Sequence, residues 1–126
     1  MSIYTNKYTV TGKMIADFGS ATGDMNPVHF DESYAAKTRF KKPIAHGMLT
    51  AGLISASLVD CFGEGTIYVS QQLNFKAPVY YKDEVDIVFE DITEITNSSK
   101  VSFTAKAFVG DTLILEGTGT VIPGDR

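Results

Sequence analysis

A carboxylate and an imidazole lie close together in the segment GDMNPVH, which spans residues 23–29. Asn26-Pro27 is typical of a turn, because proline fixes its own φ and keeps the preceding residue out of the helical region. Such a turn would let Asp24 and His29 converge on one water molecule. Histidine titrates near neutrality and a nearby carboxylate can accept a proton, so the pair predicts general acid–base chemistry. The alternative is an Asp24 that caps a turn and a His29 with no chemical role.

A second candidate group is a glycine amide in His46-Gly47-Met48, at the start of an apolar run. The first N–H groups of a helix lack acceptors within the helix, and the helix dipole favours negative charge there. Since glycine has no side chain, a carbonyl oxygen could approach its N–H closely. The pattern predicts an oxyanion hole, where one donor is worth about 3 kcal/mol in other enzymes. The alternatives are a Gly47 needed only for close packing and a His46 that orients its neighbours or only caps the helix.

The elements that position these groups change character along the chain, from helices in the first half to strands in the second. This segregation favours the α+β class. After a short strand near Lys7–Val10, Thr11 is expected to cap a helix over Lys13–Gly19 that ends by Gly23. Asp31 is expected to cap a second helix at Glu32–Lys37.

The run from Gly47 to Val59 contains no charged residue and predicts a third helix, apolar on all sides. Such a helix must be enclosed by the rest of the fold. Apolar and polar residues then alternate over 67–75, 85–89, 101–109 and 113–121, which is the period of half-buried strands. Short turns between the strands predict an antiparallel meander. The simplest arrangement is one sheet around one central helix.

Length and composition exclude several classes of protein. With 126 residues the chain is predicted to form one domain, 1–126. One cysteine and two histidines exclude a disulfide framework and leave little basis for a metal site. A net charge of −4 argues against nucleic acid as a partner. The longest uncharged apolar run is too short to cross a membrane, and the N-terminal sequence lacks a signal-peptide pattern, so a cytoplasmic location is expected.

A sheet of this kind would leave an exposed edge. An unpaired edge promotes association, and pairing with a second copy would remove that liability. We therefore expect a homodimer.

The two motifs, residues 23–29 and 46–49, resemble those of the MaoC-like (R)-specific enoyl-CoA hydratases. Both motifs are intact and in the same order, although together they cover only about a fifth of the chain. The resemblance implies a hotdog fold, a curled antiparallel sheet around a central helix, acting as a dimer. It also implies a hydro-lyase that adds water reversibly to trans-2-enoyl-CoA and forms (R)-3-hydroxyacyl-CoA.

The resemblance assigns roles to four residues. Asp24 is the general base on water, and His29 holds that water and helps to deliver a proton to the α-carbon. Gly47 N–H binds the thioester oxygen, while Asn26 supports the turn. No cofactor or metal is implied, since coenzyme A is part of the substrate.

Further residues are candidates for substrate contacts. Ser55 and Leu58 correspond to positions that limit acyl-chain length in related hydratases, although core packing explains them equally well. Gln71 is a polar exception on an apolar strand face, and a buried amide needs hydrogen-bond partners, either at the site or on a neighbouring backbone group. His46, beside Gly47, is the remaining candidate for a substrate contact.

The basic segment at residues 37–42 is a candidate for binding the phosphates of coenzyme A. Arg39, Lys41 and Lys42 could bind them through charge and hydrogen bonds. The alternative is a solvated loop in which Lys37 complements the end of a helix.

Two other functions remain open for a protein with these features. Hotdog folds also include acyl-CoA thioesterases, many of which use an acidic residue on or near the central helix, whereas this helix has no carboxylate before Asp60. The other is an acyl-CoA-binding module that has lost turnover, but Asp24, His29 and Gly47 are all present.

Overall fold

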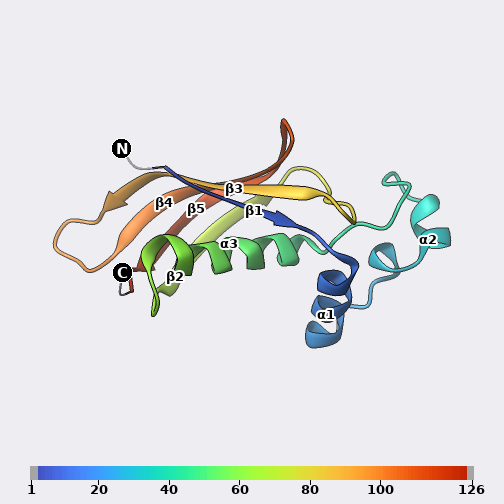
Figure 1. Cartoon of the computed structure of the whole chain (residues 1–126), viewed down its shortest axis with the longest axis horizontal. Helices are drawn as coiled ribbons and strands as arrows, with labels where there is room; N and C mark the ends of the chain where they lie inside the picture. The colour runs from blue at the N-terminus through green and yellow to red at the C-terminus, as the bar shows by residue number, and fades with distance from the viewer. Residues whose placement is uncertain (1–2, 125–126) are drawn as a thin grey trace.

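A computed structural model describes residues 3–124 as a single sheet, one long helix and a small helical cap. The elements in chain order are β1 (Tyr4–Thr9), α1 (Gly12–Thr22), the 3₁₀ turn η1 (Pro27–His29), α2 (Glu32–Ala36), α3 (Gly47–Phe62), β2 (Ile67–Phe75), β3 (Glu84–Glu94), β4 (Val101–Val109) and β5 (Thr112–Ile122). Figure 1 shows α3 lying along the curved sheet, with α1 and α2 beyond the end at which α3 begins. No helix within 3–124 combines the length and apolarity that a membrane span requires.

Local sequence signals set the ends of the helices in the cap. Thr11 caps α1 as predicted, with its side chain accepting a hydrogen bond from Met14 N–H at 3.1 Å. Gly23 ends the helix in the left-handed region at φ +79°, where glycine is favoured. Asp31 caps α2 by accepting from Tyr34 N–H at 3.0 Å. These short-range bonds hold the loop that carries the candidate acid and imidazole.

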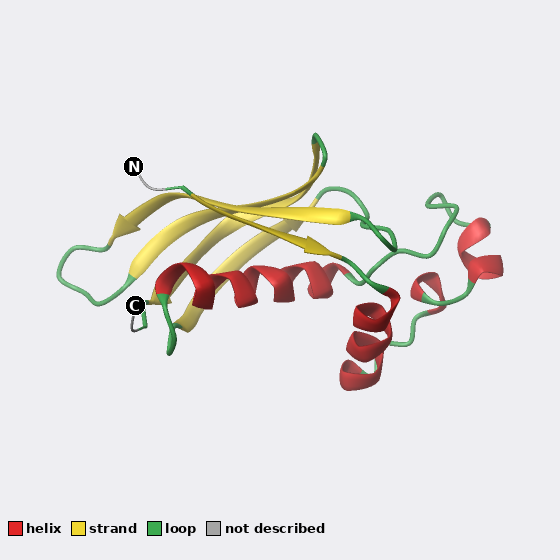
Figure 2. Ribbon diagram, in the orientation of Figure 1, coloured by secondary structure: helices red, strands yellow, loops and turns green. Residues whose placement is uncertain are grey.

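The sheet is antiparallel and its five strands are arranged in the order β1-β3-β4-β5-β2. The predicted meander is therefore correct for β3, β4 and β5, but β2 lies outside β5 instead of beside β3. The connection at residues 76–83 is longer than the usual hairpin loop, which lets the chain cross to the other side of the sheet. Figure 2 shows the strands curving over a single helix.

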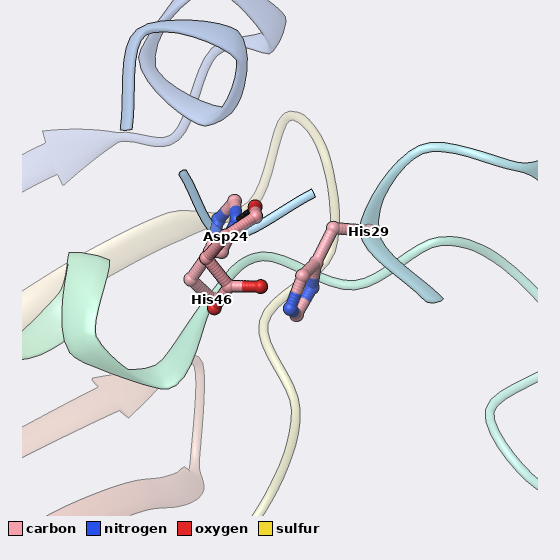
Figure 3. Close-up of side chains that lie close together, drawn as sticks. All are labelled: Asp24, His29 and His46. Carbon is pink, nitrogen blue, oxygen red and sulfur yellow. Dashed lines mark hydrogen bonds between the residues drawn. The ribbon is translucent and has the colours of Figure 1, made fainter. Parts of the chain in front are cut away.

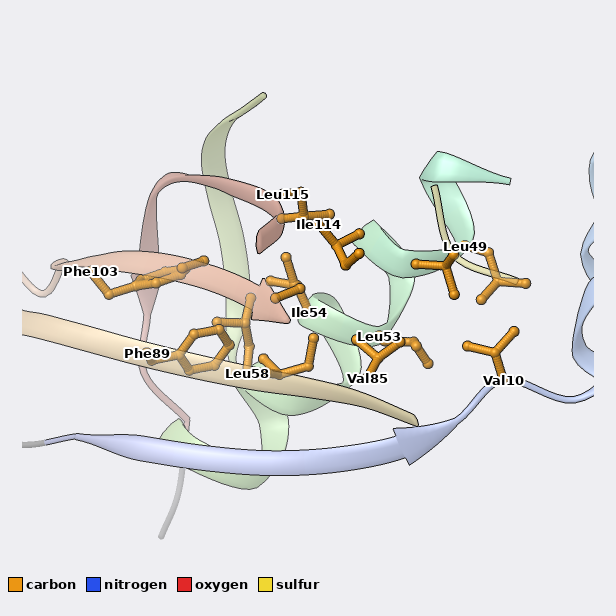
Figure 4. Close-up of a cluster of buried hydrophobic side chains, with 14 of the residues drawn as sticks. Val10, Leu49, Leu53, Ile54, Leu58, Val85, Phe89, Phe103, Ile114 and Leu115 are labelled. Atoms are coloured by element: carbon orange, nitrogen blue, oxygen red, sulfur yellow. The ribbon is translucent and has the colours of Figure 1, made fainter. Parts of the chain in front are cut away.

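The core lies between α3 and the concave face of the sheet. Ile54 and Leu58 of α3 are almost fully buried, as is Phe89 of β3. Phe89 and Phe103 belong to this core and pack with ring centroids 5.0 Å apart (Figure 4). Fully burying a side chain of this kind contributes about 2 kcal/mol, so the helix and sheet stabilise each other.

The expectation that α3 is enclosed on all sides is wrong for the part of the chain that the structure describes. Met48 and Val59 remain 55% and 47% exposed, on the side of α3 that the sheet does not cover. Strand β2 is also largely exposed, including Val69 at 42% and Phe75 at 51%. One curved sheet covers only one side of a helix, so apolar side chains of α3 and β2 are left exposed: Met48, Val59, Ile67, Val69 and Phe75. We call these exposed side chains the α3–β2 face.

Candidate acid–base site

The loop after α1 folds into a turn that its own polar groups stabilise. Asn26 Oδ1 accepts a hydrogen bond from Val28 N–H at 3.2 Å, and Asp24 Oδ1 accepts from Asn26 N–H at 3.3 Å. Pro27 opens the 3₁₀ turn, where its missing N–H costs nothing. Asn26 therefore supports the turn, and the side chains of Asp24 and His29 lie close together (Figure 3).

The imidazole of His29 is fixed by a carbonyl group from the segment that precedes α3. Its Nδ1 lies 2.7 Å from Ile44 O. A carbonyl oxygen can only accept, so Nδ1 carries the hydrogen and Nε2 of the neutral ring bears a lone pair. This tautomer is assigned from the acceptor, and it leaves Nε2 able to bind a water molecule.

Three side chains form the candidate site: Asp24, His29 and His46 each offer an atom within 4.8 Å of the other two. Asp24 is exposed, His29 is half-buried and His46 is buried. The two imidazole rings are in contact, with centroids 3.9 Å apart and planes tilted by 32°. The grouping brings a carboxylate and two imidazoles close enough for proton transfer, and the same three side chains could hold a metal ion.

His46 lies behind the acid–imidazole pair and is not exposed to a cavity. It is the N-cap residue of α3, but its side chain makes no capping bond. Instead, its Nε2 lies 3.0 Å from the backbone oxygen of Asp24. Only 2% of the residue is exposed, so its contacts within this chain are with the protein, and a contact between His46 and substrate stays a prediction.

Gly47 is the first residue of α3, as predicted, so its N–H has no acceptor within the helix. It lines a cavity of about 420 Å³ together with Thr50 and Phe75. A Cβ at Gly47 would lie 3.1 Å from the Phe75 ring, so the glycine allows this ring to pack closely beside the amide. The helix terminus and the cavity together would accommodate a developing oxyanion.

His29 lines a second cavity, of about 400 Å³, together with Phe30 and Lys42. Tyr80 contributes to both cavities. Within one chain, therefore, His29 and Gly47 lie near the same helix end but line different cavities.

The basic residues of the segment at 37–42 are divided between the two cavities. Arg39 lines the cavity at Gly47, whereas Lys42 lines the one at His29 with its Nζ 4.8 Å from the Tyr80 ring centroid. Lys41 is exposed at φ +68° and lines neither cavity.

The structure does not bring the other predicted substrate contacts to the site. Leu58 is 1% exposed and packs in the core, because its position on α3 points toward the sheet. Ser55 is exposed on the uncovered side of α3, about 12 Å along the helix from Gly47. Gln71 is exposed on β2, where it is paired with Gly119, so its amide is not buried.

Sequence reasoning missed two residues that shape the site. Thr50 is 1% exposed and lines the Gly47 cavity, and its spacing of three residues from Gly47 on one helix face was a readable signal. Gly19 in α1 is the other: a Cβ there would lie 2.7 Å from Phe30 Cζ and 3.2 Å from Asp24 O. The need for glycine at position 19 is therefore visible only in the folded structure.

A curved antiparallel sheet over one helix, with an acid and an imidazole gathered at the start of that helix, defines a hotdog-fold protein with an acid–base site. Residues 1–94 match the model of the MaoC-like domain, and the chain belongs to this family. The resemblance stated from the two motifs is confirmed.

Curated relatives and solved structures agree with this family. The chain is 40% identical over 116 residues to the 3-hydroxybutyryl-CoA dehydratase of Methylorubrum extorquens, covering 91% of this chain and 74% of that protein. It is 40% identical over 115 residues to the (R)-specific enoyl-CoA hydratase of Rhodospirillum rubrum, covering 90% and 80%. The structure of the (R)-hydratase from A. caviae aligns with a TM-score of 0.91 at 33% identity, covering 98% and 95%. The hotdog fold is thereby confirmed.

Proposed function

We propose that this chain is an (R)-specific enoyl-CoA hydratase, a hydro-lyase that adds water reversibly to trans-2-enoyl-CoA to give (R)-3-hydroxyacyl-CoA. The observation that carries the proposal is the grouping of Asp24 and His29 beside the start of α3, where the Gly47 N–H has no acceptor within the helix. Two relatives bear the names of this hydratase and of a 3-hydroxybutyryl-CoA dehydratase, which name the two directions of one kind of reaction.

The reaction follows from the chemistry of these groups. Asp24 takes a proton from water as the oxygen bonds to C3 of the enoyl group, and electron density moves to the thioester oxygen. Gly47 N–H donates to that oxygen, and the positive end of the helix dipole stabilises the enolate. A proton then returns to C2 through His29, so one water is added across the double bond. These groups need no cofactor or metal for this step.

A homodimer is part of the proposal. The α3–β2 face leaves apolar side chains open, and β2 is the last strand in the sheet, so one of its edges has no neighbouring strand within residues 3–124. A second copy that covers this face would bury the apolar side chains and pair the edge. It would also supply a wall to the cavity at Gly47, since Phe75 belongs to both.

The test is a hydration assay with crotonyl-CoA and longer enoyl-CoA substrates, with the product's chirality determined. We expect loss of absorbance at the conjugated band, no free thiol, and an (R)-alcohol. Release of thiol without loss of the enoyl chromophore would indicate a thioesterase instead. Binding of the substrate with neither change would indicate a non-catalytic acyl-CoA-binding module, and an (S)-product would contradict the assigned stereochemistry.

A further inference from the structure

His46 connects two parts of the site that are distant in sequence. Its Nε2–H donates to the Asp24 backbone oxygen at 3.0 Å, and its backbone begins the helix whose next residue is Gly47. The loop that carries the acid is therefore tied directly to the residue before the candidate oxyanion donor. A shift of the His46 ring would change the distance between base and amide.

The ring of His46 also supports that of His29. The two rings are in contact, with centroids 3.9 Å apart and planes tilted by 32°, while Phe18 and Phe30 pack around His46 with centroids at 4.7 and 5.7 Å. His29 is thus held at one nitrogen by Ile44 O and on one face by His46. These contacts leave its Nε2 as the free ring nitrogen.

The remaining nitrogen of His46, Nδ1, is buried and has no hydrogen-bond partner among residues 3–124. Because Nε2 must donate to a carbonyl, Nδ1 bears a lone pair in the neutral ring. Leaving a buried acceptor unpaired is unfavourable, and such cost is tolerated where geometry serves a function.

We propose that His46 is a positioning residue for hydration: it holds Asp24 by a hydrogen bond and His29 by ring contact, and so fixes both relative to the Gly47 amide. This inference rests on the proposed function, because it assigns a role within the same site. It predicts that the two kinds of contact can be removed separately.

Two substitutions separate the contacts. His46→Phe keeps a ring against His29 but loses the donor, while His46→Gln keeps a donor but loses the ring face. We expect each to lower kcat for crotonyl-CoA hydration by about 10- to 100-fold with KM within about twofold, since misplaced groups weaken the transition state more than substrate binding. Val85→Ala, a core substitution outside the site, is the control for lost stability and should leave kcat unchanged.

A double substitution tests whether His46 acts through its neighbours. In the Asp24→Asn background, adding His46→Phe should lower kcat far less than it does in the native protein, because Asp24 and His29 act as one unit and the loss of Asp24 already disables the pair that His46 positions. An equal further loss would overturn the proposal. So would native kcat in both single variants, or a rise in KM at constant kcat, which would indicate direct substrate binding.

The native protein offers a readout that does not depend on any variant folding. The chain has only two histidines, so a ¹⁵N spectrum of the imidazoles contains two rings. We expect His46 with hydrogen on Nε2 and an unprotonated Nδ1, and His29 with hydrogen on Nδ1. The opposite tautomer at His46 would overturn the inference. If these tautomers are found but the native protein does not hydrate enoyl-CoA, the proposed function fails while the contacts stand.

Discussion

Two regions around α3 differ in how completely the residues of one chain provide their contacts. At its N-terminal end, the acid–base loop is held by its own polar groups: Asn26 supports the turn, Ile44 O fixes His29, and His46 fixes Asp24. Along its uncovered side, Met48 and Val59 lie open beside the exposed strand β2. One chain therefore positions the candidate acid–base groups, whereas the proposed function leaves part of the substrate's surroundings to a second copy. Substitutions can therefore test the acid–base groups and the enclosure of the substrate separately.

The largest effect on hydration is expected at Asp24, in the acid–base loop at the N-terminal end of α3. Asp24→Asn preserves size but removes the group that accepts the proton from water, so kcat for crotonyl-CoA hydration should fall by about 10²- to 10⁴-fold. Asp24 is exposed, so the unfolding midpoint should change little. The absorbance assay and thermal denaturation measure the two quantities. Near-native kcat in the variant would remove Asp24 from the mechanism.

The next largest effect is expected from removing the N–H of Gly47. Gly47→Pro removes the N–H at the first position of α3, where proline is well tolerated, and His46 at φ −60° and ψ 135° already has the conformation favoured before proline. Gly47→Ala is the matched control, because it adds a Cβ but retains the N–H. We expect kcat to be about 10²- to 10³-fold lower for the proline variant than for the alanine variant. Equal kcat values in the two variants would exclude the amide as an oxyanion donor.

A charged residue on β2 tests whether the α3–β2 face is the dimer interface. Val69→Lys places an ammonium on the α3–β2 face, so we expect the dimer to dissociate, as sedimentation or light scattering would show. Thr5→Lys, on exposed β1 at the opposite edge of the sheet, adds the same charge and should leave the dimer intact. Hydration should fall by about tenfold or more in the Val69 variant if the partner completes the cavity wall. A dimer that persists in Val69→Lys would place the interface elsewhere.

Sequence predicted what neighbouring residues determine and missed what distant residues determine. Thr11, Gly23 and Asp31 act within one helical turn, so the helix ends could be predicted from sequence, and the start of α3 at Gly47 could also be predicted. The position of β2 outside β5 depends on a connection whose path no local pattern encodes. The direction of Leu58 depends on which side of an evenly apolar helix meets the sheet.

The candidate site divides in the same way. The pairing of Asp24 with His29 follows from a turn of a few residues, whereas the bond from His46 to Asp24 joins positions 22 apart in the chain. Its donor and acceptor types alone could not predict that contact. The single-domain organisation and the cytoplasmic location stay predictions.

The smallest effect, on the free energy of unfolding, is expected at Tyr68 on β2. It tests whether a second copy of the chain provides a hydrogen-bond partner for the Tyr68 hydroxyl. This hydroxyl is buried without a hydrogen-bond partner among the described residues, and burial raises its pKa to about 12. Tyr68→Phe should therefore raise the free energy of unfolding by about 1 kcal/mol at neutral pH. Because the folded pKa lies above the ordinary value of 10.0, the native protein should lose stability as pH rises from about 10 toward 12, and the variant should not lose this contribution. Denaturant unfolding at both pH values measures the difference. If the variant is less stable than the native protein at neutral pH, the hydroxyl has a partner that one chain does not supply, which would extend the dimer contact to this end of β2.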